Sequence, residues 1–245
     1  MNSKFLIFST IAVVLSFIGG FFLANALNRS EISDLKSEIS KYKGSQQAVE
    51  ESGNENVLTD EEISQKIEEA DSKPENIDYQ KDLAIGLYRY ATMKQEVKWL
   101  PDVARMMTRV YEKNPKDFNT AAVLGSIYFD IGTGKSDNES LKKAREFYQK
   151  ALEIKPKEIE VQTDLGVTYL FSTPPEPDKA IVEFQKSLQI NPKHEKTLQN
   201  MIQAKIATGK VSEAEGFLQK LKEVNPKNEA ISELTEKIEQ TKTKK

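Results

Sequence analysis

The segment GTGKS at residues 132–136 comes closest to a motif that could do chemistry, because Gly-Lys-Ser ends a phosphate-binding loop. That motif also requires a glycine five residues before its second glycine, and Phe129 occupies this position. The loop must in addition follow a β-strand, whereas this segment follows a helical pattern that ends near Tyr128. We therefore interpret it as a loop between two helices and expect no nucleotide binding.

His194 is the only histidine of the chain, and the chain contains no cysteine. A general base needs a nucleophile to activate and a third group to orient it, and the sequence beside His194 and Glu195 supplies neither. The carboxylate pairs at residues 61–62 and 68–69 lack the spacing of a calcium loop. We expect a solvated histidine at a helix start and predict no catalytic residue, no metal site and no cofactor. The chain is therefore not expected to be an enzyme.

The charges nearly cancel, with 35 Lys and Arg against 38 Asp and Glu in 245 residues. A nucleic-acid-binding protein usually carries a strong basic excess, so we expect no nucleic-acid partner. The remaining function classes are those of a protein that binds or assembles other proteins, and these depend on how the chain is organised.

The N-terminal segment from Phe5 to Leu23 contains 19 residues without a charge, enough for a helix to cross a bilayer. We predict a single-pass transmembrane anchor over residues 5–26. The alternative is a cleaved signal peptide, since Ala-Asn-Ala at residues 24–26 fits the small-x-small rule. The short lysine-containing segment before the apolar run is typical of an export signal, which favours an extracytoplasmic location of the C-terminal part, periplasmic if the source is bacterial. The basic residues that follow the anchor favour a cytoplasmic location instead.

Residues 27–58 are predicted to form a stalk. Its first part carries apolar residues at 3-4-3 spacing, which would suit a short coiled coil that pairs two chains or a helix that merely continues out of the membrane: Ile32, Leu35, Ile39 and Tyr42. Residues 44–56 are polar, acidic and glycine-containing, as in a disordered spacer. At Thr59 a capping-box pattern opens a helix and begins the folded domain, which we place at residues 59–240, before a basic tail at 241–245.

Prolines recur after helical patterns at intervals of 41, 41, 36 and 34 residues, at Pro74, Pro115, Pro156, Pro192 and Pro226. Within these units small and large residues recur in a fixed order. The first complete set is Leu124, Gly125 and Tyr128, then Ala144, Tyr148 and Ala151; the next is Leu165, Gly166 and Tyr169, then Ala180, Phe184 and Ser187. The order predicts pairs of antiparallel helices in which a small residue allows close approach, and an aromatic residue that fills the gap between neighbouring hairpins.

This pattern resembles the tetratricopeptide-repeat (TPR) family. The resemblance implies an all-α solenoid of about four helical hairpins with capping helices, in which the insertions lie in loops around residues 92–101 and 132–138. The outer units match less well, and Lys205 stands where the family has a tyrosine. The helix with Ile231, Leu234 and Ile238 would close the C-terminal end.

In the TPR family the first helices of successive hairpins line a groove that binds a protein or peptide partner. Carried over position by position, the groove residues of this chain are Lys81, Ile85, Tyr88, Arg89, Ser126, Phe129, Asp130, Val167, Leu170, Phe171, Gln199, Gln203 and Ile206. Relatives that clamp a C-terminal carboxylate use Lys and Asn at groove positions where this chain has Ala122, Ser126, Thr163 and Val167. The resemblance therefore implies an amphipathic helix or an extended segment as partner, with apolar anchors and orienting charges.

Taken together, the sequence predicts a membrane-tethered TPR scaffold that acts as an assembly or biogenesis factor. Anchor, stalk and repeats are also similar to the TPR part of c-type cytochrome biogenesis factors. The alternative is a structural membrane protein that associates with itself through stalk and solenoid.

Overall fold

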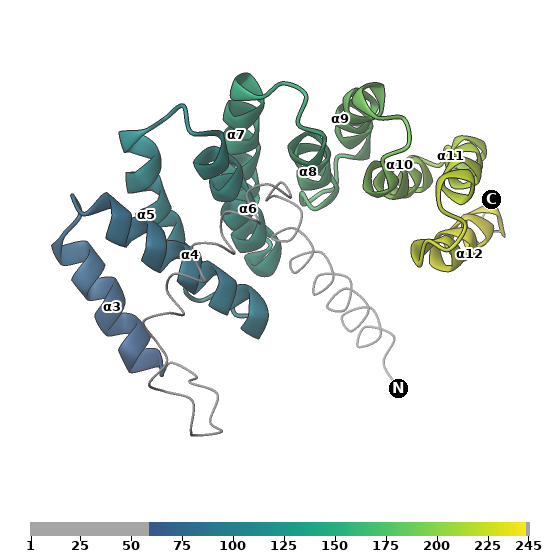
Figure 1. The fold of residues 1–245 in the computed structure, drawn as a ribbon. Coiled ribbons are helices and arrows are strands. Elements are labelled where there is room, and N and C mark those ends of the chain that lie inside the picture. Colours follow the sequence, from purple (N-terminus) through teal and green to yellow (C-terminus); the bar gives the residue numbers. More distant parts are fainter. Residues whose placement is uncertain (1–58, 244–245) are drawn as a thin grey trace, which may run out of the picture. The chain divides into compact units, whose positions relative to one another are not determined.

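The computed structural model describes residues 59–243, and every regular element in that part of the chain is an α-helix (Figure 1). The predicted anchor at 5–26 and stalk at 27–58 lie outside the described residues, as does the end of the predicted tail. Between residues 59 and 243, no helix has both the length and the apolar character needed to cross a membrane. The chain divides into two compact units, with the division between Asp102 and Val103.

The first unit contains α3 (Asp60–Ser72), α4 (Ile77–Lys94) and the first residues of α5 (Leu100–Lys113). The predicted capping box is present, since Glu62 N donates to Thr59 Oγ1 at 3.2 Å and Thr59 N donates to Glu62 Oε2 at 2.8 Å. The apolar face predicted for this helix, Ile63, Ile67 and Ala70, is buried. The predicted helix that begins after Thr59 is therefore confirmed.

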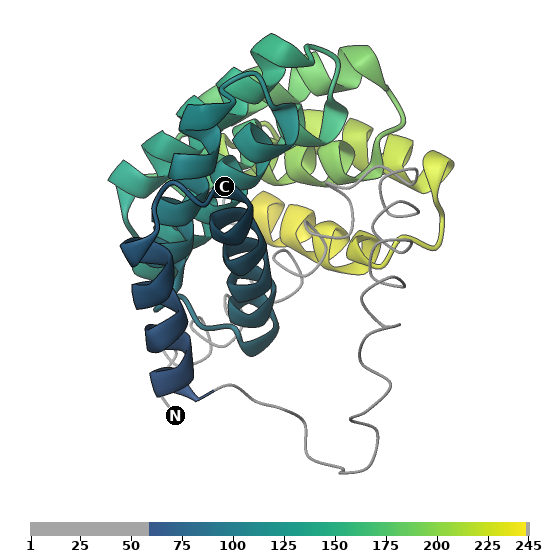
Figure 2. The ribbon, with the colours of Figure 1, turned by 60° about the vertical axis from the view of Figure 1, so that its left-hand side comes forward.

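The second unit contains most of α5 and then a series of helix pairs. The pairs are α6 (Phe118–Lys135) with α7 (Asn138–Ile154), α8 (Ile159–Leu170) with α9 (Pro177–Ile190), and α10 (Glu195–Ala207) with α11 (Val211–Val224), before a last helix, α12 (Ala230–Thr243). Figure 2 shows these helices side by side in chain order from teal to yellow. The all-α series of helical hairpins predicted from the sequence is confirmed.

The five recurring prolines occupy equivalent turns. In each turn the residue two positions after the proline donates its N–H to the carbonyl of the residue directly before the proline, at 3.1 to 3.3 Å. Examples are the bonds from Asp117 to Asn114 and from His194 to Asn191. Proline therefore stands at the second position of a β-turn, where its fixed φ is favourable. Proline is therefore not the first residue of the next helix, which begins three residues after each of the first four prolines and four residues after Pro226.

Glycine on a first helix meets an aromatic ring on the second. A Cβ at Gly125 would lie 2.5 Å from Tyr148 Cδ1, and a Cβ at Gly166 would lie 2.5 Å from Phe184 Cε1. Both rings are almost fully buried, and Ala144 and Ala180 beside them are completely buried. The predicted close approach at small residues is confirmed in both hairpins, while each ring packs on the glycine of its own hairpin rather than only between neighbouring hairpins.

At the C-terminal end, Leu234 and Ile238 of α12 join a core cluster with residues of α10 and α11, among them Ile202, Leu218 and Leu221. The expectation that the last helix covers the apolar edge is confirmed, with Ile231 at the rim of that cluster.

The insertions differ from the prediction. The segment at 132–135 is not a loop but the last turn of α6, which ends at Ser136 in a left-handed conformation with φ 52°. Gly132 remains packed on α7, because a Cβ there would lie 2.7 Å from Leu141 Cγ. In the first unit α4 likewise extends through Lys94 and ends at Gln95 with φ 57°. The extra residues therefore lengthen α4 and α6.

The close contact at Gly166 and the open space at Gly216 predict opposite effects of a glycine-to-alanine substitution on stability. Gly166→Ala should destabilise a fragment of residues 59–245 by about 1–3 kcal/mol, because the new methyl group overlaps the Phe184 ring. Gly216→Ala on α11 should stabilise it by up to about 1 kcal/mol, because a Cβ there meets nothing within 4 Å and alanine favours helix. Urea denaturation followed by circular dichroism measures both, and equal effects at the two sites would contradict the packing described.

Candidate functional site

The predicted groove residues lie on first helices of hairpins. Those numbered 81 to 89 lie on α4 in the first unit, and those numbered 126 to 206 lie on α6, α8 and α10, or directly after α8, in the second. Their spacing along each helix puts them on a shared face, as the family pattern implies. The structure therefore supports their placement on the helices, while partner binding by these residues stays a prediction.

Three of the predicted anchors expose little surface. Tyr88 is 5% exposed, Phe129 is 4% exposed and Val167 is 3% exposed. Phe129 is covered because it meets Phe171 edge to face, with ring centroids 5.5 Å apart. These side chains contribute to the packing of the hairpins, so a partner could contact only their margins in this conformation.

The accessible part of the predicted groove is smaller and mixed in character. Half-buried members are Ile85, Ser126, Asp130, Leu170, Phe171, Gln199 and Ile206, and exposed members are Lys81, Arg89 and Gln203. Some polar members already have bonds within the chain. Gln199 Nε2 donates to Asn228 Oδ1 at 2.8 Å, and Ser126 Oγ accepts from Tyr148 Oη at 3.3 Å. In the second unit, the apolar groove members that remain available lie on α8, directly after it, and on α10, and in the first unit Ile85 of α4 is half-buried.

The segment after α8 is held by the preceding hairpin, and it carries Phe171. Asn138 makes two bonds to Thr173, donating from Nδ2 to the carbonyl at 2.6 Å and accepting from the backbone N–H at 2.9 Å. Arg145 Nη1 also donates to Ser172 Oγ at 3.3 Å. These contacts fix the position of Phe171 against Phe129, so this part of the groove is preorganised.

A cluster of charged side chains joins α8 to α10. His194 Nε2 lies 2.8 Å from Glu160 Oε1, and Lys196 Nζ lies 3.2 Å from Glu160 Oε2 and 2.7 Å from Asp164 Oδ1. Because a carboxylate accepts only, Nε2 carries the proton and donates it to Glu160. We call these four residues the α8–α10 clasp.

A group of three hydroxyls continues the clasp inward. Thr163, Ser187 and Thr197 are completely buried, and their oxygens lie 2.7 to 2.9 Å from one another. Thr197 Oγ1 also lies 2.6 Å from His194 Nδ1, so hydroxyls and clasp form one network across α8, α9 and α10. Satisfied polar groups of this kind fix one arrangement of the helices.

Burial and charge act in opposite directions on the two carboxyls of the clasp. Burial raises the pKa of Asp164 to about 6, and the ammonium of Lys196 only partly offsets this rise. At Glu160 burial acts to raise the pKa, but the bond from His194 and the charge of Lys196 prevail, so the pKa lies below its ordinary value.

The expectation of a solvated His194 is wrong. Its side chain is 17% exposed and makes two bonds, because the residue directly before α10 faces the start of α8 in the preceding hairpin. The signal for this contact lay in the repeat, since Glu160 precedes His194 by 34 residues, one repeat period. Glu195 makes the matching contact to Asn228, 33 residues later, with Asn228 Nδ2 donating to its carboxylate at 2.7 Å.

Lys205, which stands where the family has tyrosine, is only 5% exposed. Its ammonium reaches Glu213 Oε2 on α11 at 2.6 Å. The aliphatic stem thus fills space between the helices while the charge finds a partner at the surface.

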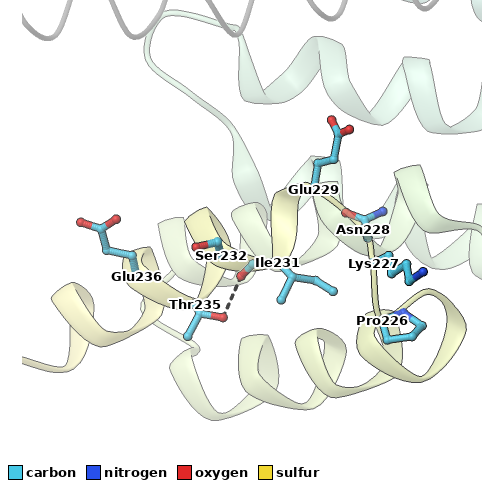
Figure 3. A pocket seen from close by; sticks show the side chains of 8 residues that line it. All are labelled: Pro226, Lys227, Asn228, Glu229, Ile231, Ser232, Thr235 and Glu236. Carbon is cyan, nitrogen blue, oxygen red and sulfur yellow. Dashed lines mark hydrogen bonds between the residues drawn. The ribbon is translucent and has the colours of Figure 1, made fainter.

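A shallow hollow of about 650 Å³ lies beside the last turn and α12 (Figure 3). Thr235 and Glu236 line it, and they correspond to Met201 and Ile202 one period earlier, which are completely buried. The hollow therefore lies where the second helix of a further hairpin would pack, and its polar lining explains why α12 can end the series.

Among residues 59–243, no group of three or more His, Asp or Glu side chains is placed to hold a metal ion.

Comparisons with known proteins agree with this geometry. Residues 125–158 and 176–238 match family models of the tetratricopeptide repeat, so the chain contains tetratricopeptide repeats. No curated protein matches the sequence. Among solved structures, the crystal structure of MamA has 20% identity and a TM-score of 0.52, with 68% of this chain and 88% of that chain covered. A thermophilic TPR protein of Thermus thermophilus, TTC0263, has 15% identity and a TM-score of 0.51, with 74% and 88% covered. At these identities the likeness shows the fold.

The raised pKa of Asp164 predicts how stability depends on pH. The folded chain holds this proton more tightly than the unfolded chain, whose carboxyl titrates near 3.8, so stability from Asp164 is present at low pH and is lost as pH rises through about 6. Relative to the Asp164→Asn variant, the free energy of unfolding of the wild type should fall by up to about 3 kcal/mol between about pH 4 and pH 7. Urea denaturation at a series of pH values measures the difference.

The matched control is Asp178→Asn, whose exposed carboxylate pairs with Lys210 at the surface. Its stability relative to the wild type should change little over the same range. A difference curve for Asp164→Asn that is flat, or that rises in favour of the wild type with pH, would show that the pKa of this carboxyl is not raised.

Proposed function

We propose that this chain is a membrane-tethered scaffold that binds a segment of a partner protein along its first helices, as an assembly or biogenesis factor. Tetratricopeptide repeats generally mediate protein–protein interaction, and the chain contains them. The observation that carries the proposal is the set of half-buried apolar side chains, Leu170, Phe171 and Ile206, on α8, directly after it, and on α10.

The chemistry of this surface favours an amphipathic or extended partner segment. Leu170, Phe171 and Ile206 supply apolar contacts, and the exposed Gln203 beside them supplies hydrogen bonds. A clamp for a terminal carboxylate is disfavoured, since Ala122 and Thr163 are buried and the Thr163 hydroxyl belongs to the three-hydroxyl group. Asp130 of α6, in the same unit, would then orient the partner through charge.

Tethering is the second part of the proposal, and it rests on the apolar run within residues 5–26. The folded domain would then be held near a membrane, on its extracytoplasmic side, where it could receive a partner as that partner is assembled. The likeness to cytochrome c biogenesis factors stays a prediction from the sequence.

Site-specific crosslinking tests where the partner binds. A photoreactive phenylalanine analogue at position 171 of the full chain should give a covalent adduct in membranes, because Phe171 belongs to the proposed surface. The same analogue at position 182 on α9, where Val182 is 48% exposed, should give none. An adduct at 182 without one at 171 would move the site to the second helices.

With the captured partner, Phe171→Ala should weaken binding by more than about 1 kcal/mol, as expected for an anchor residue. Lys186→Ala should be near neutral, because this exposed lysine only pairs with Glu183 of its own helix. Phe129→Ala is expected to weaken binding as well, but it also removes a buried ring. Melting temperatures of all three variants serve as the folding control.

Fractionation tests the tether and the alternative function. An uncleaved anchor keeps the full chain in the membrane pellet after carbonate washing, with the N-terminal residues recovered by mass spectrometry; a mature chain that begins at Leu27 would establish a signal peptide. If the chain is instead a self-associating structural protein, it should elute from a sizing column as an oligomer that is lost on removal of residues 27–43.

A further inference from the structure

Three aromatic side chains from successive helices of the second unit meet outside the predicted groove. Tyr111 of α5 and Phe147 of α7 are perpendicular with ring centroids 5.4 Å apart, and Tyr128 of α6 stacks on Phe147 at 5.6 Å. All three rings are half-buried, so each keeps an accessible part. We call these residues the aromatic cluster.

Two lysines of α7 lie over the aromatic cluster. Lys143 Nζ is 5.3 Å from the centre of the Tyr128 ring, and Lys150 Nζ is 4.7 Å from Phe147 and 5.2 Å from Tyr111. Such cation–π contacts hold the ammonium groups over the rings without neutralising their charge, and the charge of Lys143 also acts on the Asp137 carboxylate.

The two lysines differ in this respect from other lysines of the chain. Lys186, Lys196 and Lys205 each have a carboxylate oxygen within 3.2 Å. Within residues 59–243, neither Lys143 nor Lys150 makes an ion pair. Their charges are therefore available to a carboxylate from outside.

The spacing on α7 puts both charges and one ring on the same face. Residues 143, 147 and 150 are four and three positions apart, so they line one side of the helix, and the backbone positions of the two lysines are separated by two turns, about 10 Å along the axis. The surface thus presents apolar rings between two cations. Carboxylates on either side of an apolar side chain would complement it.

We propose that Lys143, Lys150 and the aromatic cluster form a second docking surface, which binds an acidic segment of a partner protein with an apolar side chain between its carboxylates. Ring contacts from three helices hold the surface in place before binding. It lies mainly on α7, the second helix of its hairpin, so it does not depend on the proposed groove.

A nucleic acid or an acidic membrane fits this surface less well. Either would need a broad basic field, whereas the chain has a formal net charge of −3. Two cations around an apolar centre suit a short acidic peptide better than a polyanion.

The test is a fluorescence anisotropy titration of the full chain in detergent with a labelled peptide that alternates glutamate pairs and apolar pairs, EELFEELFEE. The double variant Lys143→Glu with Lys150→Glu should weaken binding by about tenfold or more, and added salt should weaken wild-type binding. Lys142→Glu is the matched control, because Lys142 lies beside Lys143 but over no ring, and it should change affinity by less than about threefold. Phe171→Ala should leave peptide affinity unchanged, which separates this surface from the groove.

Circular dichroism spectra must match the wild type for every variant. The proposal is overturned if the peptide does not bind, if the double variant binds it like the wild type, or if Lys142→Glu weakens binding as much as the double variant. Tighter binding of duplex DNA or phosphatidylserine vesicles through the same two lysines would also overturn it in favour of a polyanion site.

Discussion

The approach of two helices at a glycine is the constraint on which the hairpins depend. At Gly125 and Gly166 the Tyr148 and Phe184 rings occupy the space that a Cβ would need. The ring on the second helix therefore packs directly on the backbone of the first helix and fixes the distance between the two helices. This contact sets the rotation of α6 and of α8 about their axes. It thereby decides which side chains face the second helix and which remain for a neighbour or a partner.

Register between hairpins depends on a different interaction. The α8–α10 clasp and the bond from Asn228 to Glu195 both join residues one repeat period apart, at the start of successive first helices. Buried charges are costly unless they are paired, and Asp164 shows this cost in its raised pKa. A slip of one residue between α8 and α10 would leave Lys196 and Asp164 buried without each other. The clasp therefore opposes alternative registers more than it adds stability.

The sequence was most informative where a contact is local and repeated. Gly125 with Tyr148 and Gly166 with Phe184 could be predicted because the spacing recurs and only small residues fit. The position of His194 at a helix start does not by itself indicate its hydrogen-bond partners, since Glu160 lies in the preceding hairpin. The burial of Phe129 likewise depends on Phe171, which a separate segment carries. Helical spacing indicates the face on which a side chain lies but not what covers that face.

These constraints leave α8 little freedom to bind a partner along its length. Every residue from Val161 to Thr168 is buried, so the half-buried apolar side chains of α8 lie at its ends: Ile159 at the start, and Tyr169 and Leu170, followed by Phe171, at the other end. The insertions of the middle repeats follow the same end of the first helices, and Asn138 ties one of them to Thr173 beside Phe171. Extra residues at this place leave the glycine contacts intact while they shape the surroundings of the proposed anchor. The part of the repeat that departs from the family period is thus the part that can distinguish this chain's partner from those of other repeat proteins.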